Sequence, residues 1–442
     1  MSLLRQGDAG QGPAKLRRSV AGTLPLALYA TATGLLEPLA PALLARRARA
    51  GKEDPARLYE RLGRPAMARP EGPLAWLHGV SVGESLSLLP LIAALKAARP
   101  GLNLLVTSGT VTSAEVLAKR LPSGVIHQYA PVDAPGAAAR FLDHWRPDTA
   151  LFVESELWPN LIVAAKARGV KLALLSARMT EGSARGWARA PATARTLLQT
   201  LDLVLPQDAA TDARLQSLGA ATGLQLNLKL VGDPPPVDAD LVAALRAWAA
   251  GRKIVLAAST HPGEEPLIAK AFLYATGSLP AVLVVAPRHP DRGLAVATEL
   301  KAWKMTVAQR AAGEPLTAQT TAYVADTLGE LGAFYAAADA VVIGGAFAEG
   351  VGGHNPLEAA RLGCAVVTGA NAFNARDIYA EMFAEVAALE ASDLASLSSH
   401  IHGLLTNPVI ARRIGEAAQA YANRQGAALT AAMVLIEPLL PA

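Results

Sequence analysis

The sequence predicts an α/β protein made of two doubly wound domains in tandem. Its 442 residues exceed what one hydrophobic core usually holds, so more than one domain is expected. From residue 74 onward, short and continuously apolar runs alternate with amphipathic stretches, which is typical of parallel sheets covered by helices on both faces. The alternation breaks at Pro234, Pro235 and Pro236 and then resumes, which indicates a second domain of the same kind.

The apolar runs define the expected strands, and a ligand cleft is expected between the carboxyl ends of the strands of the two domains. In the first domain, strands are expected at residues 74–78, 102–107, 149–153, 171–175 and 203–205, with helices at 85–98 and 111–121. In the second domain, strands are expected at 253–257, 281–286, 323–325, 340–343 and 365–368, followed by helices from about residue 391. The expected divisions are a segment at 1–50, a first Rossmann-like domain at 51–230 and a second at 231–442, with a linker at 225–240.

Composition narrows the possible functions. Hydrophobic residues make up 52% of the chain and charged residues 18%, which excludes extensive disorder. The net charge of +4 suits anionic lipid, phosphorylated substrates or nucleic acid, and the lack of a clustered basic and aromatic patch argues against nucleic acid. Cys364 is the only cysteine, so an intramolecular disulfide is excluded. No Cys/His cluster with the spacing of a structural zinc site occurs.

The segment at 1–50 is interpreted as a flexible tail, at 1–14, followed by a membrane-associated part. The run from Ser19 to Leu36 contains no charged residue and ends at Glu37. Its 18 residues are about the minimum for spanning a bilayer, but prolines interrupt the region. A helix in the membrane interface fits as well, and a signal peptide or a hairpin packed on the protein surface are further alternatives. Basic residues flank the run on both sides, at Lys15, Arg17, Arg18, Arg46, Arg47 and Arg49.

The first candidate site residue is Glu84, which follows an expected strand in the sequence WLHGVSVGE. Gly79 and Gly83 allow a tight turn and a close approach of a ligand to the backbone. A carboxylate at this strand end can take a proton from an attacking hydroxyl. The alternative is a helix-start glutamate stabilised by the helix dipole, and the motif alone favours that alternative.

Two further carboxylates, Glu154 and Glu156, follow another expected strand in FVESELWPN. Placed this close together, they suit a cationic or hydroxyl-rich ligand, although one of them can instead cap the next helix. Trp158 can stack on a sugar or fill the core, and the core is the more common place for a tryptophan.

Two strand ends of the second domain also contain polar groups. In ASTHPGEE, Ser259 or Thr260 is expected to cap the following helix, with Pro262 in its first turn. In APRHP, Arg288 is suited to bidentate binding of a phosphate, with a surface salt bridge as the alternative.

The most informative segment contains Gly344-Gly345-Ala346 and the sequence GGHNPLE at 352–358. Five glycines within the ten residues 344–353 predict a pocket lined by backbone N–H groups. Asn355 is expected to cap a helix whose first residue is Pro356, so that the helix start faces an anion. Glu358 is placed to accept hydrogen bonds from a ribose. The segment matches neither a Walker loop nor a G-x-G-x-x-G dinucleotide motif.

These segments resemble the bacterial transferases of 3-deoxy-D-manno-octulosonic acid (Kdo) that act on lipid A precursors. The resemblance extends over about residues 55–435, and six motifs in the same order are far more specific than any one of them. The motifs are HGVSVGE (78–84), VESELWPN (153–160), STHPGEE (259–265), APRHP (286–290), VADTLGEL (324–331) and GGHNPLE (352–358).

The resemblance implies the GT-B fold, in which two Rossmann-like domains face each other across a cleft. It implies an inverting glycosyltransferase of lipopolysaccharide core biosynthesis, with CMP-Kdo as co-substrate, no cofactor or metal, and Glu84 as general base. It further implies anchoring at the inner membrane with the cleft on the cytoplasmic side. The predicted donor-binding residues are Ser259, His261, Arg288, His289, Gly329, Glu330, Leu331, Gly353, Asn355 and Glu358, and the predicted acceptor-binding residues are Ser81, Gly83, Glu154 and Glu156.

Several positions depart from the family pattern, and the acceptor side is affected more than the donor side. Ala346 replaces a usual serine and Ala359 a usual proline, while residues 110–114, 129–133 and 227–229 keep only part of their motifs. A close Kdo analogue therefore remains an alternative donor. Another GT-B enzyme, such as a different sugar transferase or an epimerase, and a non-catalytic membrane-bound relative are the alternative functions.

Overall fold

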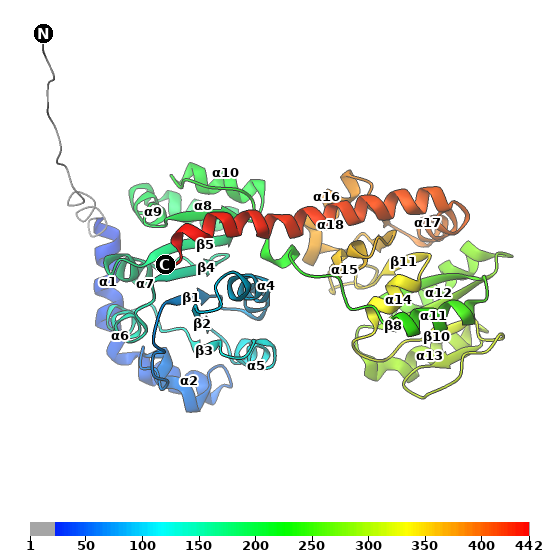
Figure 1. Cartoon of the computed structure of the whole chain (residues 1–442), viewed down its shortest axis with the longest axis horizontal. Helices are drawn as coiled ribbons and strands as arrows, with labels where there is room; N and C mark the ends of the chain where they lie inside the picture. Colours follow the sequence, from blue (N-terminus) through cyan, green and yellow to red (C-terminus); the bar gives the residue numbers. More distant parts are fainter. Residues whose placement is uncertain (1–22, 442) are drawn as a thin grey trace, which may run out of the picture. The chain divides into compact units, whose positions relative to one another are not determined.

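The computed structural model describes residues 23–441 (Figure 1). The predicted tail at 1–14, the basic residues Lys15, Arg17 and Arg18, and Ser19 lie outside the described residues. The chain divides into two compact units, and each is described by itself. The first unit comprises the chain up to Gly232 together with the segment from Ala427 onward, and the second comprises Asp233–Gly426.

The first unit is built on a parallel sheet with the strand order β3-β2-β1-β4-β5-β6. The order reverses between β1 and β4, and ligands of doubly wound folds bind outside the carboxyl ends of the strands at such a switch point. The strands are β1 (Leu74–His78), β2 (Asn103–Ser108), β3 (Ile126–Tyr129), β4 (Thr149–Val153), β5 (Lys171–Ala177) and β6 (Leu203–Pro206).

Helices cover both faces of this sheet, because its strands are apolar on both sides. One core joins the sheet to α6, α7, α9 and α10, and the other joins it to α4, α5 and the last turns of α18. The helices of the unit, including short 3-10 turns, are α1 (Leu24–Leu36), η2 (Glu37–Leu39), α2 (Ala40–Arg49), η3 (Pro55–Arg57), α3 (Leu58–Arg61), α4 (Val82–Ala98), α5 (Val111–Arg120), α6 (Pro135–Trp145), α7 (Pro159–Ala167), α8 (Glu181–Ala188), α9 (Pro191–Leu198), α10 (Ala209–Ser217) and η4 (Leu228–Leu230).

The second unit has a parallel sheet with the order β13-β12-β11-β7-β8-β10-β9, and its switch point lies between β7 and β11. Its strands are β7 (Lys253–Thr260), β8 (Ala281–Pro287), β9 (Val307–Gln309), β10 (Ala322–Val324), β11 (Ala340–Ile343), β12 (Val366–Gly369) and β13 (Ala388–Ala391). Its helices are α11 (Ala239–Ala249), α12 (Glu264–Thr276), η5 (Pro290–Arg292), α13 (Gly293–Ala302), α14 (Leu331–Ala337), α15 (Leu357–Arg361), η6 (Phe373–Ala375), α16 (Arg376–Ala384), α17 (Leu394–Thr406) and most of α18 (Pro408–Ile436).

The predicted α/β class is confirmed, and every predicted strand is present to within a few residues. Three strands were missed, namely β3, β9 and β13, and all three lie at the edges of their sheets. An edge strand has one neighbour and is less buried than a central one, so its sequence needs no continuous apolar run. The sequence of β3, IHQY, and that of β13, ALEA, illustrate this.

The N-terminal helices pack on the first unit through one side. Helix α1 lies beside α6 and α7 (Figure 1). The Tyr29 hydroxyl donates a hydrogen bond of 3.0 Å to Asp133, and Glu37 accepts bonds of 2.8 Å from the Gly136 N–H and 2.7 Å from Arg140. The prolines do not break this region into loops, because each one lies at the start of α1, η2 or α2, where no backbone donor is required.

Helix α18 belongs to both units, since its last turns contribute to the core of the first. Ala432 and Ile436 are fully buried there beside Leu440, and Arg99 of α4 forms a hydrogen bond of 2.8 Å with Glu437 of η7 (Glu437–Leu439). No feature of the sequence predicted this return of the chain.

Candidate active site

Glu84 lies in the first turn of α4, directly after β1, where its carboxylate completes a capping box with Ser81. The carboxylate accepts hydrogen bonds of 2.7 Å from the Val80 N–H and 2.8 Å from the Ser81 hydroxyl, and the Ser81 oxygen accepts the Glu84 N–H at 3.3 Å. The helix-start interpretation is therefore correct as a description of its local structure. These bonds also hold the half-buried carboxylate in one orientation at the switch point of the sheet.

Glu154 follows β4, the strand that pairs with β1 on the other side of the same switch point. It is buried, has a positive φ of 58°, and its Oε1 lies 2.6 Å from the Lys229 ammonium. The Lys229 side chain also passes Gly83, since a Cβ on Gly83 would lie 3.8 Å from its Cε. Lys229 thus links Glu154 to the start of α4. The prediction missed this role, because the pair is separated by 75 positions in the sequence.

Glu156 is oriented by an aromatic pair. It accepts a hydrogen bond from the Trp158 indole, and its Oε2 lies 3.6 Å from Nε2 of the buried His78. The other His78 nitrogen is 2.8 Å from the Thr107 hydroxyl. Trp158 is partly buried against the core and packs edge-on against His78, so its packing role is present in the structure.

In the second unit, the turn after β7 differs from the predicted cap. Helix α12 begins at Glu264 with Gly263 as its N-cap and has no side-chain cap, so neither Ser259 nor Thr260 caps it and Pro262 lies before it. Thr260 is buried and its hydroxyl donates to Glu265 at 2.8 Å, which removes it from capping. Ser259 has a positive φ of 57°, and its carbonyl oxygen lies against Gly344 of the next strand end.

Three histidines lie close together near the carboxyl end of β7. Nε2 of His261 lies 2.8 Å from Nε2 of His354 with the two ring planes nearly parallel, and the His289 ring lies edge-on 6.0 Å from that of His261. Burial, assisted by His261, Arg288 and His289, lowers the pKa of His354 to about 4. Burial also lowers the pKa of His261. His354 belongs to the motif GGHNPLE, but it was not predicted as a site residue.

Arg288 is exposed beside this cluster. Among the described residues, no acidic side chain lies within 4.0 Å of its guanidinium, so the salt-bridge alternative is not realised there. An exposed arginine at this position suits an incoming phosphate.

The glycine segment forms two linked turns after β11. Gly345, Gly352 and Gly353 all have positive φ angles, and the Gly353 N–H donates to the Gly345 carbonyl at 2.7 Å. Asn355 is exposed, and its side chain accepts the Leu357 N–H at 2.9 Å. Helix α15 begins at Leu357, one residue later than predicted, and it has only five residues. Glu358 in its first turn is exposed.

The predicted turn Gly329-Glu330-Leu331 leads into α14, whose N-cap is Glu330 and whose first residue is Leu331. The Glu330 carboxylate binds Arg310 and accepts the Thr327 hydroxyl, and Arg310 also donates to the Tyr323 hydroxyl at 3.0 Å. The Arg310 guanidinium lowers the pKa of Glu330. The side chain of Glu330 is therefore held by Arg310, which the prediction missed, while Gly329 remains exposed with a positive φ of 87°.

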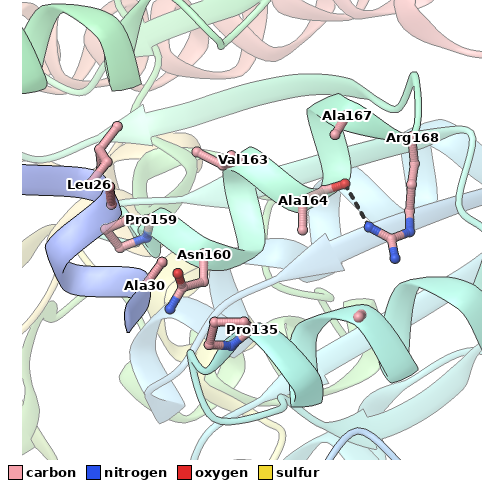
Figure 2. A pocket seen from close by; sticks show the side chains of 11 residues that line it. Leu26, Ala30, Pro135, Pro159, Asn160, Val163, Ala164, Ala167 and Arg168 are labelled. Atoms are coloured by element: carbon pink, nitrogen blue, oxygen red, sulfur yellow. Dashed lines mark hydrogen bonds between the residues drawn. The ribbon is translucent and has the colours of Figure 1, made fainter. Parts of the chain in front are cut away.

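Two further observations concern the described residues as a whole. They contain no group of three or more His, Cys, Asp or Glu side chains arranged to hold a metal ion. A groove of about 330 Å³ lies between α1, α6 and α7 and is lined mainly by apolar side chains (Figure 2). Figure 2 shows Leu26 and Ala30 of α1 facing Pro159 and Val163 of α7, with Arg168 at the far end.

Two doubly wound units, each with polar side chains at the carboxyl ends of its strands, form an α/β architecture of the GT-B class. The fold agrees with a solved glycosyltransferase from Rickettsia africae, which matches 84% of this chain and 99% of its own with a TM-score of 0.54 and 12% identity. A family model described as 3-deoxy-D-manno-octulosonic-acid transferase (kdotransferase) matches residues 56–231.

Two relatives with similar sequences over most of the chain show the family to which it belongs. A probable mitochondrial 3-deoxy-D-manno-octulosonic acid transferase of Arabidopsis thaliana is 38% identical over 359 residues, 79% of this chain and 80% of the relative. The 3-deoxy-D-manno-octulosonic acid transferase of Bordetella pertussis is 36% identical over 416 residues, 89% of this chain and 94% of the relative. The chain belongs to the Kdo transferase family, and it is a glycosyltransferase.

Proposed function

We propose that this chain transfers Kdo from CMP-Kdo to a lipid A precursor in lipopolysaccharide biosynthesis, at the cytoplasmic face of the inner membrane. The observation that supports the donor assignment most strongly is the group formed by Arg288, His261 and the glycine turns at the switch point of the second unit. Such a group offers a cation, imidazole hydrogen bonds and backbone N–H groups to a phosphate.

In the proposed reaction, Glu84 is the general base. Its carboxylate takes the proton of an acceptor hydroxyl while the hydroxyl oxygen bonds to the anomeric carbon of Kdo, and the bond from that carbon to the phosphate oxygen breaks. CMP leaves with the bonding electrons, and the configuration at the anomeric carbon is inverted. An ionised carboxylate has about four acceptor positions, so the bonds from Val80 and Ser81 leave capacity for the acceptor hydroxyl.

On the donor side, we propose that Arg288 and His289 contact the phosphate and that Ser259 and His261 line the sugar-phosphate position. Asn355 and Glu358, both exposed, bind the nucleoside with the backbone at Gly353. The turn at Gly329, Glu330 and Leu331 contributes backbone groups, because the Glu330 carboxylate is bound to Arg310. Charge that develops on the leaving phosphate is stabilised by donors already in place.

On the acceptor side, we propose that Ser81, Gly83, Glu154 and Glu156 border the position of the glucosamine hydroxyl. Glu154 acts together with Lys229, whose ammonium suits a phosphate of the lipid A precursor. The transfer itself requires no metal ion, so EDTA is expected to leave the rate unchanged.

We further propose that α1, η2 and α2 lie in the membrane interface. The side of α1 that contains Tyr29 and Thr33 forms hydrogen bonds with the first unit, whereas Leu24, Leu28 and Leu35 are 72%, 59% and 76% exposed. Residues Leu24–Arg49 are long and apolar enough to span a bilayer, but spanning would break the bonds to Asp133 and Asn160. An interfacial helix keeps these bonds and inserts its leucines.

The test combines purified full-length protein, CMP-Kdo and a lipid A precursor in detergent or vesicles. Mass spectrometry of the lipid product then reports the sugar added, the acceptor and the number of transfers. We expect a Kdo adduct and equimolar release of CMP. If the protein is stabilised by UDP rather than by CMP, or if no CMP is released, the proposed donor is wrong.

A further inference from the structure

We infer that Glu264 is a positioning residue that holds the donor-binding turns of the second unit in place, an inference that rests on the proposed function. Glu264 is the first residue of α12 and is 1% exposed, so its carboxylate cannot itself touch a ligand. A buried carboxylate is unfavourable unless its oxygens are fully hydrogen-bonded. The hydrogen bonds that the Glu264 carboxylate accepts therefore identify the backbone segments that it holds in place.

The carboxylate binds two different strand ends through their backbone N–H groups. Oε2 accepts the His261 N–H at 2.8 Å, Oε1 accepts the Phe347 N–H at 2.9 Å, and both oxygens lie 2.8 Å from the Gly345 nitrogen. His261 follows β7 and Gly345 follows β11, and these two strands pair at the switch point of the sheet. Glu264 thus joins the two turns between which the proposed donor binds.

The glycines around this carboxylate are packed too closely for other residues. A Cβ on Gly344 would lie 2.7 Å from the Ser259 carbonyl oxygen and 2.8 Å from Oε2 of Glu264. A Cβ on Gly345 would lie 2.8 Å from the His354 ring, and Gly345 has a positive φ of 81°. The two turns are therefore in direct contact with Glu264 and with each other, and the hydrogen bond between His261 and His354 joins them a second time.

An isosteric change identifies the role of the charge. In Glu264→Gln, one oxygen becomes an NH₂ group, which can only donate hydrogen bonds. Whichever of the two positions the NH₂ group takes, either the His261 N–H or the Phe347 N–H loses its acceptor and faces a donor. One of the two turns must then move away, and the donor-binding groups are no longer held in register.

A matched control exists at the other end of the same strands. Asp339 precedes β11 and accepts the Ile254 N–H of β7 at 2.8 Å, so it also joins these strands through a backbone N–H, but at their amino ends. Asp339→Asn is expected to weaken the same sheet without displacing the turns after β7 and β11.

The experiment measures CMP binding by calorimetry, the KM for CMP-Kdo and for the lipid acceptor, and the melting temperature. We expect Glu264→Gln to weaken CMP binding at least tenfold and to raise the KM for CMP-Kdo, with the KM for the acceptor unchanged. Asp339→Asn is expected to lower the melting temperature with CMP binding unchanged. A purely structural loss would lower the active fraction, and hence the apparent kcat, while leaving both KM values at their wild-type levels.

If Glu264→Gln does not fold, Gly345→Ala tests the same contact from its other side, because the added methyl must displace the turn from His354. It is expected to weaken CMP binding with the acceptor KM unchanged. Wild-type CMP affinity in Glu264→Gln would overturn the inference while leaving the proposed function intact. If Glu264→Gln does not fold, wild-type CMP affinity in Gly345→Ala would overturn it in the same way. If the wild-type protein itself does not bind CMP, the proposed function fails first.

Discussion

His261 and His354 share a hydrogen bond of 2.8 Å between their Nε2 atoms, which ties the turn after β7 to the second glycine turn after β11. In such a pair one imidazole donates and the other accepts, so the pair is intact only while at least one ring is neutral. Because burial and the neighbouring Arg288 disfavour the protonated form of His354, both turns are held together at neutral pH. Acid is therefore expected to loosen this region.

The stability of the protein should report this loosening between about pH 6.5 and pH 4. The pKa of His354 is lowered from 6.5 to about 4 in the folded protein, so the unfolded chain binds this proton first as the pH falls. The contribution of His354 to the free energy of unfolding is unchanged above about pH 6.5 and falls below it. Melting temperatures measured from pH 7 to pH 4 should decline less steeply in His354→Gln than in the wild type. His127, whose pKa burial also lowers to about 4, titrates identically in both proteins.

Glu84→Gln should separate the chemistry of Glu84 from its structural role. A glutamine can replace glutamate in a capping box, so the melting temperature should stay close to that of the wild type. Loss of a general base lowers kcat by about 10²- to 10⁴-fold, and CMP affinity should be retained. Glu84→Ala should lose the same activity and in addition some stability, because it removes the bonds that Glu84 contributes to the capping box of α4. Turnover at the wild-type rate in Glu84→Gln would refute the base assignment.

Arg288→Ala should weaken CMP binding without affecting folding. A hydrogen bond to a charged group contributes about 1.5–3 kcal/mol, which corresponds to a loss of affinity of roughly 10- to 150-fold. The guanidinium is exposed and has no acidic partner among the described residues, so the melting temperature should not change. Calorimetry with CMP tests the first expectation and differential scanning fluorimetry the second. Equal affinity in the variant would remove Arg288 from the donor site.

The double variant Leu28→Glu/Leu35→Glu should release the protein from membranes. Both leucines are well exposed, and glutamates there would be repelled by the bilayer interface and by its anionic lipids. Flotation with vesicles of phosphatidylethanolamine and phosphatidylglycerol measures the bound fraction. Leu294→Glu in α13, at a leucine that is 70% exposed, is the matched control and should float like the wild type. Unchanged flotation of the double variant would rule out attachment through this face.

The sequence allowed the fold class and the central strands to be predicted, because a strand buried on both faces needs a continuous apolar run. Strands β3, β9 and β13 escaped prediction because an edge strand needs no such run. The cap of α12 was predicted incorrectly because the Thr260 hydroxyl, a good capping group in isolation, is bound by the buried Glu265. Local rules describe a residue well only where tertiary contacts do not compete for it.

Parts of the candidate site were also beyond prediction, for a related reason. His261, Arg288 and His289 were predicted at the ends of two strands, and they lie close together because β7 and β8 are adjacent and parallel. Their partners come from distant parts of the chain: His354 is 93 positions from His261, and Gly345 is 81 positions from Glu264. The pairing of Lys229 with Glu154 depends in the same way on η4 packing against α4. The separation of two residues in the sequence does not predict how close their side chains lie in the folded protein.

The last turns of α18 have a consequence for how the protein is made. Ala432, Ile436 and Leu440 complete a core whose other members were synthesised some two hundred residues or more earlier. During synthesis, the first unit therefore cannot close this apolar surface until residues 432–440 have emerged from the ribosome, although domains usually fold in order of synthesis. Until then, that surface is open to chaperones and to proteases. Truncation before Ala432 should therefore reduce cellular abundance strongly, because it leaves this core open.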